Sequence, residues 1–194
     1  MLGAALGITP TVGGSHPDHG TCNQLFSLGG AQYFEVLGPD PAATQEGPMA
    51  KRATKLRAPD IWTFAVTTKD LDALAVRARA LGLSVQGPTP GSRRTPTGET
   101  LHWRYLYLIS PEFKGLVPFA IDWLDTPHPS RTTVQGVRLQ SMLVTHPRAD
   151  ALAALYAALG LEMTVHHGAR SAIVVTLAHG SRVSTLIGSG DGIH

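Results

Sequence analysis

One helical pattern occurs twice in this chain. Residues 69–83 and 147–161 align with Gly82 on Gly160, at an offset of 78 residues, and both stretches carry an Asp near the start and Leu-Gly-Leu at the end. In both, apolar residues recur at steps of three and four, which is typical of a helix that packs one face on a sheet. Each glycine can supply the left-handed residue that commonly ends a helix. The repeat therefore predicts at least two copies of one folding unit.

Strand-like runs surround each helix. Apolar runs precede the helices at residues 61–66 and 139–144, and further runs separated by Gly-containing turns follow them. Residues 5–8 resemble the end of the repeated helix, so another copy begins near the N-terminus without its own first strand. Residues 38–60 contain four Pro and are predicted to be a linker.

The expected fold class is therefore α+β, with repeated βαβββ modules that form curved mixed sheets and a first module that is N-terminally truncated. The predicted boundaries are 1–58 for the truncated module and its linker, 59–127 for the second module and 128–194 for the third. A truncated module leaves an exposed sheet edge. Either a partner chain covers that edge, which favours a homodimer, or an upstream natural start supplies the missing strand.

Composition limits the class of partner. The chain has 194 residues and a formal charge of +2, with only a loose basic segment at residues 51–57, so a small-molecule ligand is expected and nucleic acid and membrane partners are not. The single cysteine, Cys22, excludes an intrachain disulfide framework and fits a reducing compartment. No apolar run approaches the roughly 20 residues that cross a bilayer. We predict a cytoplasmic protein.

The first candidate site lies in residues 13–23, which are predicted to form a loop because of their Gly, Pro and Asp content. His16, His19, Thr21 and Asn23 fall within this short segment. Two interpretations of these polar residues are open. The side chains could tie down their own backbone, as such residues commonly do in turns, or they could contact a ligand.

A hairpin follows, with strands at 23–28 and 32–37 joined by two glycines. Glu35 lies in the middle of the second strand among apolar residues, and Asp122 lies in a similar apolar run. A carboxylate in such a setting is costly unless it is paired, hydrogen-bonded or bound to metal. Glu35 is therefore the leading site candidate, and a salt bridge to Lys or Arg is the alternative explanation.

A third feature is an aromatic stripe in the strand predicted at residues 100–109, which follows a predicted loop containing Arg93. Alternation places Trp103 and Tyr105 on one side of this strand and Arg104 on the other. Such a stripe could line a ligand cavity, although aromatic stripes more often pack in a core.

These segments together resemble a known family. Residues 13–23, 33–36, 39–41 and 118–123, together with Trp103, are similar to glyoxalase-like domain proteins. These belong to the vicinal oxygen chelate superfamily, whose building block is a strand, a helix and three strands. The superfamily includes glyoxalase I, extradiol dioxygenases and bleomycin-resistance binding proteins.

The resemblance implies a cup in which two modules hold one divalent ion, of zinc, iron, manganese or nickel, through His or Gln paired with Glu. The last-strand ligands map onto Glu35 and Asp122. The first-strand position of the second module falls near Trp62, which cannot bind metal, and the first module lacks the corresponding strand. The expected cofactor is therefore one divalent ion held by an incomplete ligand set, or none.

Two functions follow from the resemblance. The first is a lyase, isomerase or dioxygenase of the glyoxalase-like class that acts on a small oxygen-rich metabolite, with Glu35 and His16 as catalytic residues. The second is a metal-free protein that binds or sequesters a small molecule, like the bleomycin-resistance members. The predicted substrate-binding residues are His19, Thr21, Asn23, Trp62, Trp103, Arg104 and Tyr105. An assembly module completed by a partner is a third reading.

Overall fold

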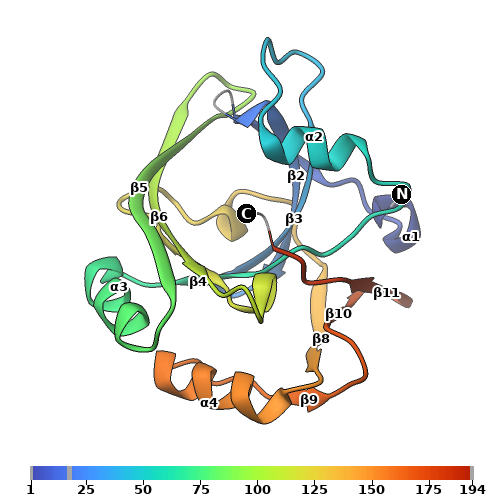
Figure 1. Ribbon diagram of the computed structural model, residues 1–194. Helices are drawn as coiled ribbons and strands as arrows, with labels where there is room; N and C mark the ends of the chain where they lie inside the picture. The colour runs from blue at the N-terminus through green and yellow to red at the C-terminus, as the bar shows by residue number, and fades with distance from the viewer. Residues whose placement is uncertain (1, 17–18, 193–194) are drawn as a thin grey trace.

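A curled sheet that forms a half-barrel dominates the computed structural model, which describes residues 2–16 and 19–192 (Figure 1). Its strands are β1 (Thr11–His16), β2 (Thr21–Gly29), β3 (Gln32–Pro39), β4 (Ala65–Thr67), β5 (Ser84–Arg94), β6 (Thr100–Ile109) and β7 (Phe119–Asp122). They lie in the order β3-β2-β1-β5-β6-β7-β4, and β4 pairs with β7 in parallel while the other neighbours are antiparallel. This mixed, curled sheet confirms the predicted fold class.

The repeated helices form where the pattern predicts them. The helices are α1 (Leu2–Leu6), α2 (Pro48–Thr54), α3 (Leu71–Ala80) and α4 (Ala149–Leu159), with short 3-10 helices η2 (Lys114–Leu116) and η3 (Pro129–Arg131). Beyond α3 and at the end of α4, Gly82 and Gly160 adopt φ values of 82° and 81°. The buried positions of α4 include Leu152 and Tyr156, which belong to the predicted apolar stripe.

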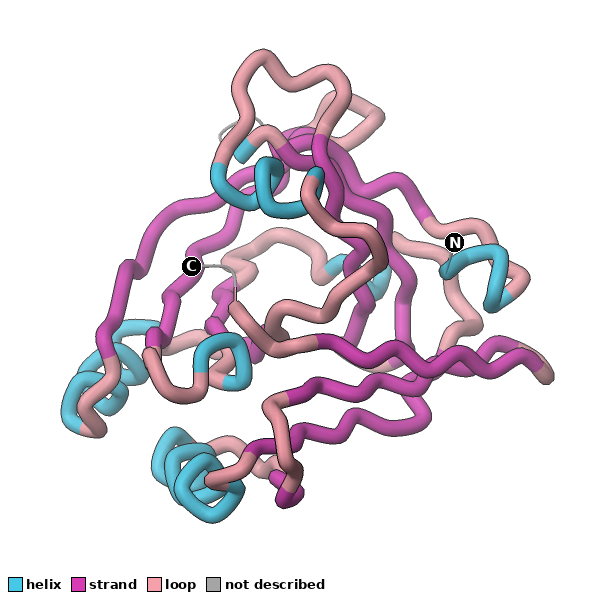
Figure 2. Tube along the Cα trace, turned by 45° about the vertical axis from the view of Figure 1, so that its right-hand side comes forward, coloured by secondary structure: helices cyan, strands magenta, loops and turns pink. Residues whose placement is uncertain are grey.

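The last third of the chain forms a smaller sheet below the half-barrel (Figure 2). Its strands are β8 (Arg138–His146), β9 (Val165–His167), β10 (Ala172–His179) and β11 (Arg182–Gly188), in the order β11-β10-β8-β9. In the preceding unit the first strand, β4, lies at the sheet edge, whereas here β8 lies between two neighbours. A shared order of elements along the chain does not fix the pairing order, because pairing also depends on tertiary packing.

One hydrophobic core joins the two sheets and the helices. Leu6 of α1, Phe26 of β2, Leu106 of β6 and Ile173 of β10 are all fully buried in the same cluster. Burying a side chain of this size contributes roughly 1.5–3 kcal/mol. The hydroxyl of Tyr156 also donates to the backbone carbonyl of Leu116, which connects α4 to η2.

Glycine- and proline-rich segments differ most from the expectation. The predicted loop at 13–23 is wrong at both ends, because residues 13–16 belong to β1 and residues 21–23 belong to β2. A Cβ at Gly14 would lie 2.0 Å from the carbonyl oxygen of Arg94. The absent side chain lets β1 approach β5. Within the predicted linker, Pro48 opens α2, since proline suits the first turn of a helix. Residues 17 and 18 of the predicted loop lie outside the described residues.

The two edges of the larger sheet are formed by β3 and β4, and β3 is the edge of the first unit. The expected dimer contact at that edge stays a prediction. None of the helices in the described part of the chain has the length and apolar character needed to cross a membrane.

Candidate functional site

The β2–β3 hairpin presents a paired amide and carboxylate. Asn23 pairs with Leu37, and Glu35 pairs with Leu25, so alternation places both polar side chains on one face of the hairpin. Asn23 Nδ2 donates a hydrogen bond of 2.7 Å to Glu35 Oε1. The amide is buried, at 4% exposure, whereas the glutamate is exposed. The carboxylate can therefore reach solvent or a ligand while its supporting amide is held in place.

A buried guanidinium holds the other end of that amide. Arg93 Nη1 on β5 donates to Asn23 Oδ1 at 3.2 Å, and Arg93 is only 6% exposed. Gly13 makes this contact possible, because a Cβ at that position would lie 2.1 Å from Asn23 Oδ1 and 2.5 Å from Arg93 Nη1. Arg93, Asn23 and Glu35 thus form a hydrogen-bonded relay that crosses from β5 to β3.

His16 completes the polar group. It ends β1 opposite Thr21, and the two side chains are 3.2 Å apart between Nδ1 and Oγ1. Burial lowers the pKa of His16, and the positive charge of Arg93 adds to this effect while Glu35 opposes it. A lowered pKa keeps the imidazole neutral at pH 7, in a form that can both donate and accept a hydrogen bond.

Aromatic rings form a wall beside these polar groups. His16 meets Trp103 edge to face at 6.3 Å between centroids, and Trp103 lies 5.5 Å from Trp123. The contacts continue from Trp123 to Tyr33 at 6.1 Å and from Tyr33 to His128 at 5.5 Å. The wall therefore joins β6 and the end of β7 to β3, across the concave face of the sheet.

The tyrosines of this face remain neutral. Burial raises the pKa of Tyr107 to about 12, with Tyr105 and Glu35 adding to the shift. Burial likewise raises the pKa of Tyr33, and Glu35 adds to the increase while Arg93 opposes it. The charge of Glu35 thus contributes to the raised pKa values of tyrosines on both β3 and β6.

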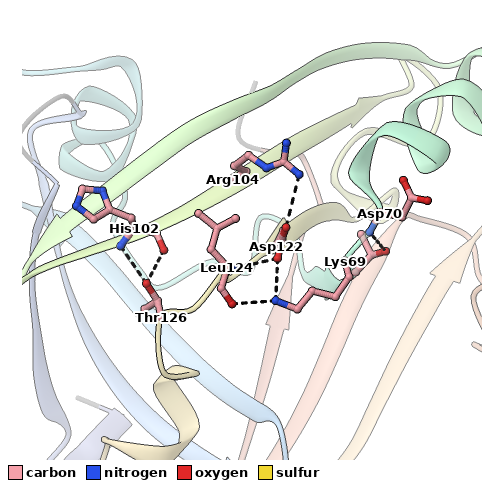
Figure 3. Close-up of polar contacts among 8 residues, drawn as sticks. Lys69, Asp70, His102, Arg104, Asp122, Leu124 and Thr126 are labelled. Atoms are coloured by element: carbon pink, nitrogen blue, oxygen red, sulfur yellow. Dashed lines mark hydrogen bonds and ion pairs between the residues drawn. The ribbon is translucent and has the colours of Figure 1, made fainter.

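Asp122 and Arg104 lie on the other face of the sheet. Arg104 pairs with Asp122 in the β6–β7 register, and their side chains form an ion pair of 3.6 Å. Lys69 Nζ lies 3.1 Å from Asp122 Oδ1, which also accepts the backbone N–H of Leu124 at 3.0 Å (Figure 3). Alternation along β6 turns Trp103 to the concave side and Arg104 away from it.

Asp122 is consequently held by its own neighbours. Burial alone would raise its pKa, but the Leu124 N–H, the Lys69 ammonium and the charge of Arg104 outweigh that effect and leave the pKa below its ordinary value. Its oxygens are used within the fold, and Glu35 faces the opposite side of the sheet. The structure therefore does not bring together the two residues expected to bind a metal ion.

The remaining predicted ligand contacts are placed as follows. The guanidinium carbon of Arg52 lies 4.4 Å from the centroid of the Trp62 ring. The backbone carbonyl of Trp62 accepts the N–H of Gly192 at 2.8 Å. His19 lies against the segment before α2, where a Cβ at Gly47 would be 2.6 Å from the His19 carbonyl oxygen. Their predicted roles in ligand binding stay predictions.

The donor set does not match the metal site that the superfamily implies. Among residues 2–16 and 19–192, no three or more His, Cys, Asp and Glu side chains form a group that could hold a metal ion. The polar cluster on the concave face instead consists of one carboxylate, one amide, one guanidinium and one imidazole. These residues suit hydrogen bonding and proton transfer.

Two surface hollows lie away from this cluster. One of about 470 Å³ is lined by Gln32 and by residues of the last unit such as Met142 and His166. The other, of about 290 Å³, lies between the ends of α3 and α4. Neither contains the relay, so the concave face is distinguished by its chemistry and not by its volume.

Sequence reasoning missed Arg93, Tyr33, Trp123 and His128 as members of the site. The signal for Arg93 was available, because alternate positions along β5 pair with alternate aromatic positions of β6, as in the pair Gly91 and Trp103. The proline and glycine content of that segment concealed the strand. Nothing in the sequence placed His128 against Tyr33, because that contact depends on how the chain folds back after β7.

Comparisons with known proteins agree with this architecture. The family model described as glyoxalase-like domain matches residues 1–160. The chain therefore belongs to the glyoxalase-like domain family, within the vicinal oxygen chelate superfamily. A search of curated proteins finds no significant match.

Among solved structures, the fold is similar to a crystal structure of a hypothetical protein from Staphylococcus aureus, with a TM-score of 0.58 and 16% sequence identity. The match covers 93% of this chain and 77% of the other. At this identity the likeness supports the fold alone.

Proposed function

We propose that the concave face binds a small oxygen-rich carbonyl metabolite and that Glu35 moves a proton on it. The observation that carries this proposal is the Arg93–Asn23–Glu35 relay, in which one carboxylate oxygen accepts the amide while the side chain remains exposed. A base must be fixed in direction and yet reach its substrate.

The proposed step is a proton transfer with no change in oxidation state. Glu35 takes a proton from a carbon next to a carbonyl group, the C–H electron pair forms the new C=C bond, and the carbonyl oxygen becomes an enolate. Neutral His16 and Tyr33 are the hydrogen-bond donors on this face that would stabilise the enolate. Return of the proton to the same carbon gives exchange. Where that carbon bears a hydroxyl group, the hydroxyl proton moves to the enolate oxygen, the former carbonyl carbon takes the proton from Glu35, and the result is isomerisation.

A second candidate function is binding without turnover. The aromatic wall of Trp103, Trp123 and Tyr33 supports it, because stacked rings hold planar ligands through apolar contact. In that case Glu35 serves only as a hydrogen-bond acceptor.

Deuterium exchange separates the two functions. Pyruvate, 2-oxobutyrate and hydroxyacetone are incubated with the protein in D2O, and loss of the proton signals next to the carbonyl is followed by NMR. We expect exchange with the wild type and its loss in Glu35→Gln, with binding retained. The matched control is Glu99→Gln, an exposed glutamate in the turn between β5 and β6. Binding without exchange would favour the second function, and absence of binding by all three compounds would overturn both.

A further inference from the structure

Arg93 is a buried cation with unused donors. Its guanidinium carries five N–H groups. One Nη1 donor reaches Asn23, whereas Nε is buried without any hydrogen-bond partner. Among the described residues, no carboxylate oxygen lies within 4.0 Å of its nitrogens, since no ion pair includes it.

Such an arrangement is costly in the absence of a ligand. Burying a charge without a directly paired counter-ion disfavours the folded state, and a buried N–H without a partner adds to that cost. Arginine cannot relieve the cost by losing its proton. Arg104 also has a buried Nε without a hydrogen-bond partner, but its guanidinium is paired with Asp122 in the same sheet. The two arginines therefore differ in the missing counter-ion of Arg93.

The surroundings of Arg93 define what could pair with it. Glu35 is the nearby negative charge, but Asn23 stands between the two groups and bonds to both. His16 and Tyr33, whose titration responds to Arg93, are neutral. An arriving anion would therefore meet one positive charge and neutral donors, and would have Glu35 beside it.

We propose that Arg93 binds the carboxylate of the ligand, so that the substrate class of this site is small 2-oxo or 2-hydroxy acids. Arginine matches a carboxylate with two parallel hydrogen bonds. When the carboxylate of the ligand binds Arg93, the adjacent carbonyl or hydroxyl carbon of the ligand lies on the side towards Glu35. This inference rests on the proposed function, because it assumes that the ligand occupies the concave face.

The test compares acids with their neutral methyl esters. Binding of pyruvate, 2-oxobutyrate and benzoylformate, and of the methyl ester of each, is measured by titration calorimetry. We expect each acid to bind the wild type ~10- to 100-fold more tightly than its ester, as expected for hydrogen bonds to charged groups. Arg93→Gln should abolish this preference and Arg93→Lys should retain part of it. Arg94→Gln, a neighbouring exposed arginine, should leave it unchanged.

A second measurement covers the case in which Arg93→Gln fails to fold. The acids should raise the melting temperature of the wild type, and the esters should raise it less at the same concentration. Equal binding of acids and esters, or a preference that survives in folded Arg93→Gln, would overturn the inference. If the esters bind and exchange their protons as well as the acids do, the proposed function stands and the carboxylate assignment falls. Acids that bind through Arg93 but do not exchange their protons would support the carboxylate assignment and overturn the proposed proton transfer.

Discussion

The fold treats the carboxylates of Glu35 on β3 and Asp122 on β7 in opposite ways, although the sequence predicts equivalent ligand roles for the two. Glu35 on β3 is exposed, faces the concave side and bonds to one amide. Asp122 on β7 is 5% exposed and is held by Lys69, Arg104 and the Leu124 N–H. The comparison shows that a carboxylate in an apolar strand can be either a structural anchor or an accessible reactive group. The face of the sheet on which the carboxylate lies decides which of these two roles it has.

The largest expected effect is on stability. Asp122→Ala should lower the free energy of unfolding by about 2–3 kcal/mol, because it leaves Lys69, Arg104 and a backbone N–H without their acceptor. This loss of unfolding free energy is smaller than that expected for a fully buried ion pair, because the Lys69 side chain is 71% exposed. Glu35→Gln, which keeps an oxygen to accept the Asn23 amide, should change the free energy of unfolding by less than about 1 kcal/mol. Urea unfolding of both variants measures the difference. Equal losses of unfolding free energy would contradict the distinction between the structural and the accessible carboxylate.

Gly13→Ala tests whether the relay beside Glu35 depends on a missing side chain. The new methyl group would overlap Asn23 Oδ1, so we expect a loss of about 1–3 kcal/mol and a weakened Arg93–Asn23 contact. Gly38→Ala in β3 is the control, because nothing lies within 4 Å of a Cβ at that position. Thermal unfolding of both variants is sufficient, and a Gly13→Ala protein as stable as the control would contradict the described packing.

The pH dependence of stability gives a smaller effect. The pKa of Asp122 is below its ordinary value of 3.8 in the folded state, so its stabilising contribution is complete above that pH and is lost as the pH falls through the folded pKa. The stability difference between the wild type and Asp122→Asn should therefore narrow as the pH falls below 3.8. Urea unfolding between pH 6 and pH 3 checks this. A difference that does not vary with pH would show that the partners of Asp122 do not stabilise its charged form.

The repeat and the helices were predictable because they follow from local periodicity. The strand at residues 100–109 was also predicted with the bounds that β6 has, since its aromatic and β-branched residues favour strands. Glu35 was identified because a charge in an apolar strand needs an explanation. For Asp122 the explanation that applies is the salt bridge, which had been the alternative for Glu35.

The remaining parts of the site could not be predicted because they depend on contacts between distant segments. Gly14 and Arg93 lie in segments that were predicted to be loops, yet both belong to strands that pair at the centre of the sheet. Arg93 reaches Asn23 across 70 residues of sequence. Periodicity within one element contains no information about such partners, so only the folded chain assembles the relay.

Measuring the exchange rate and the unfolding free energy of Glu35→Gln and Asp122→Asn side by side tests the central distinction most directly. We expect Glu35→Gln to retain its stability and to lose proton exchange at least ~100-fold, the usual contribution of a positioned base. Asp122→Asn should lose stability and, while folded, keep the exchange rate of the wild type. A Glu35→Gln protein with full exchange activity, or an Asp122→Asn protein that is stable but inactive, would contradict the assignment of function to the concave face.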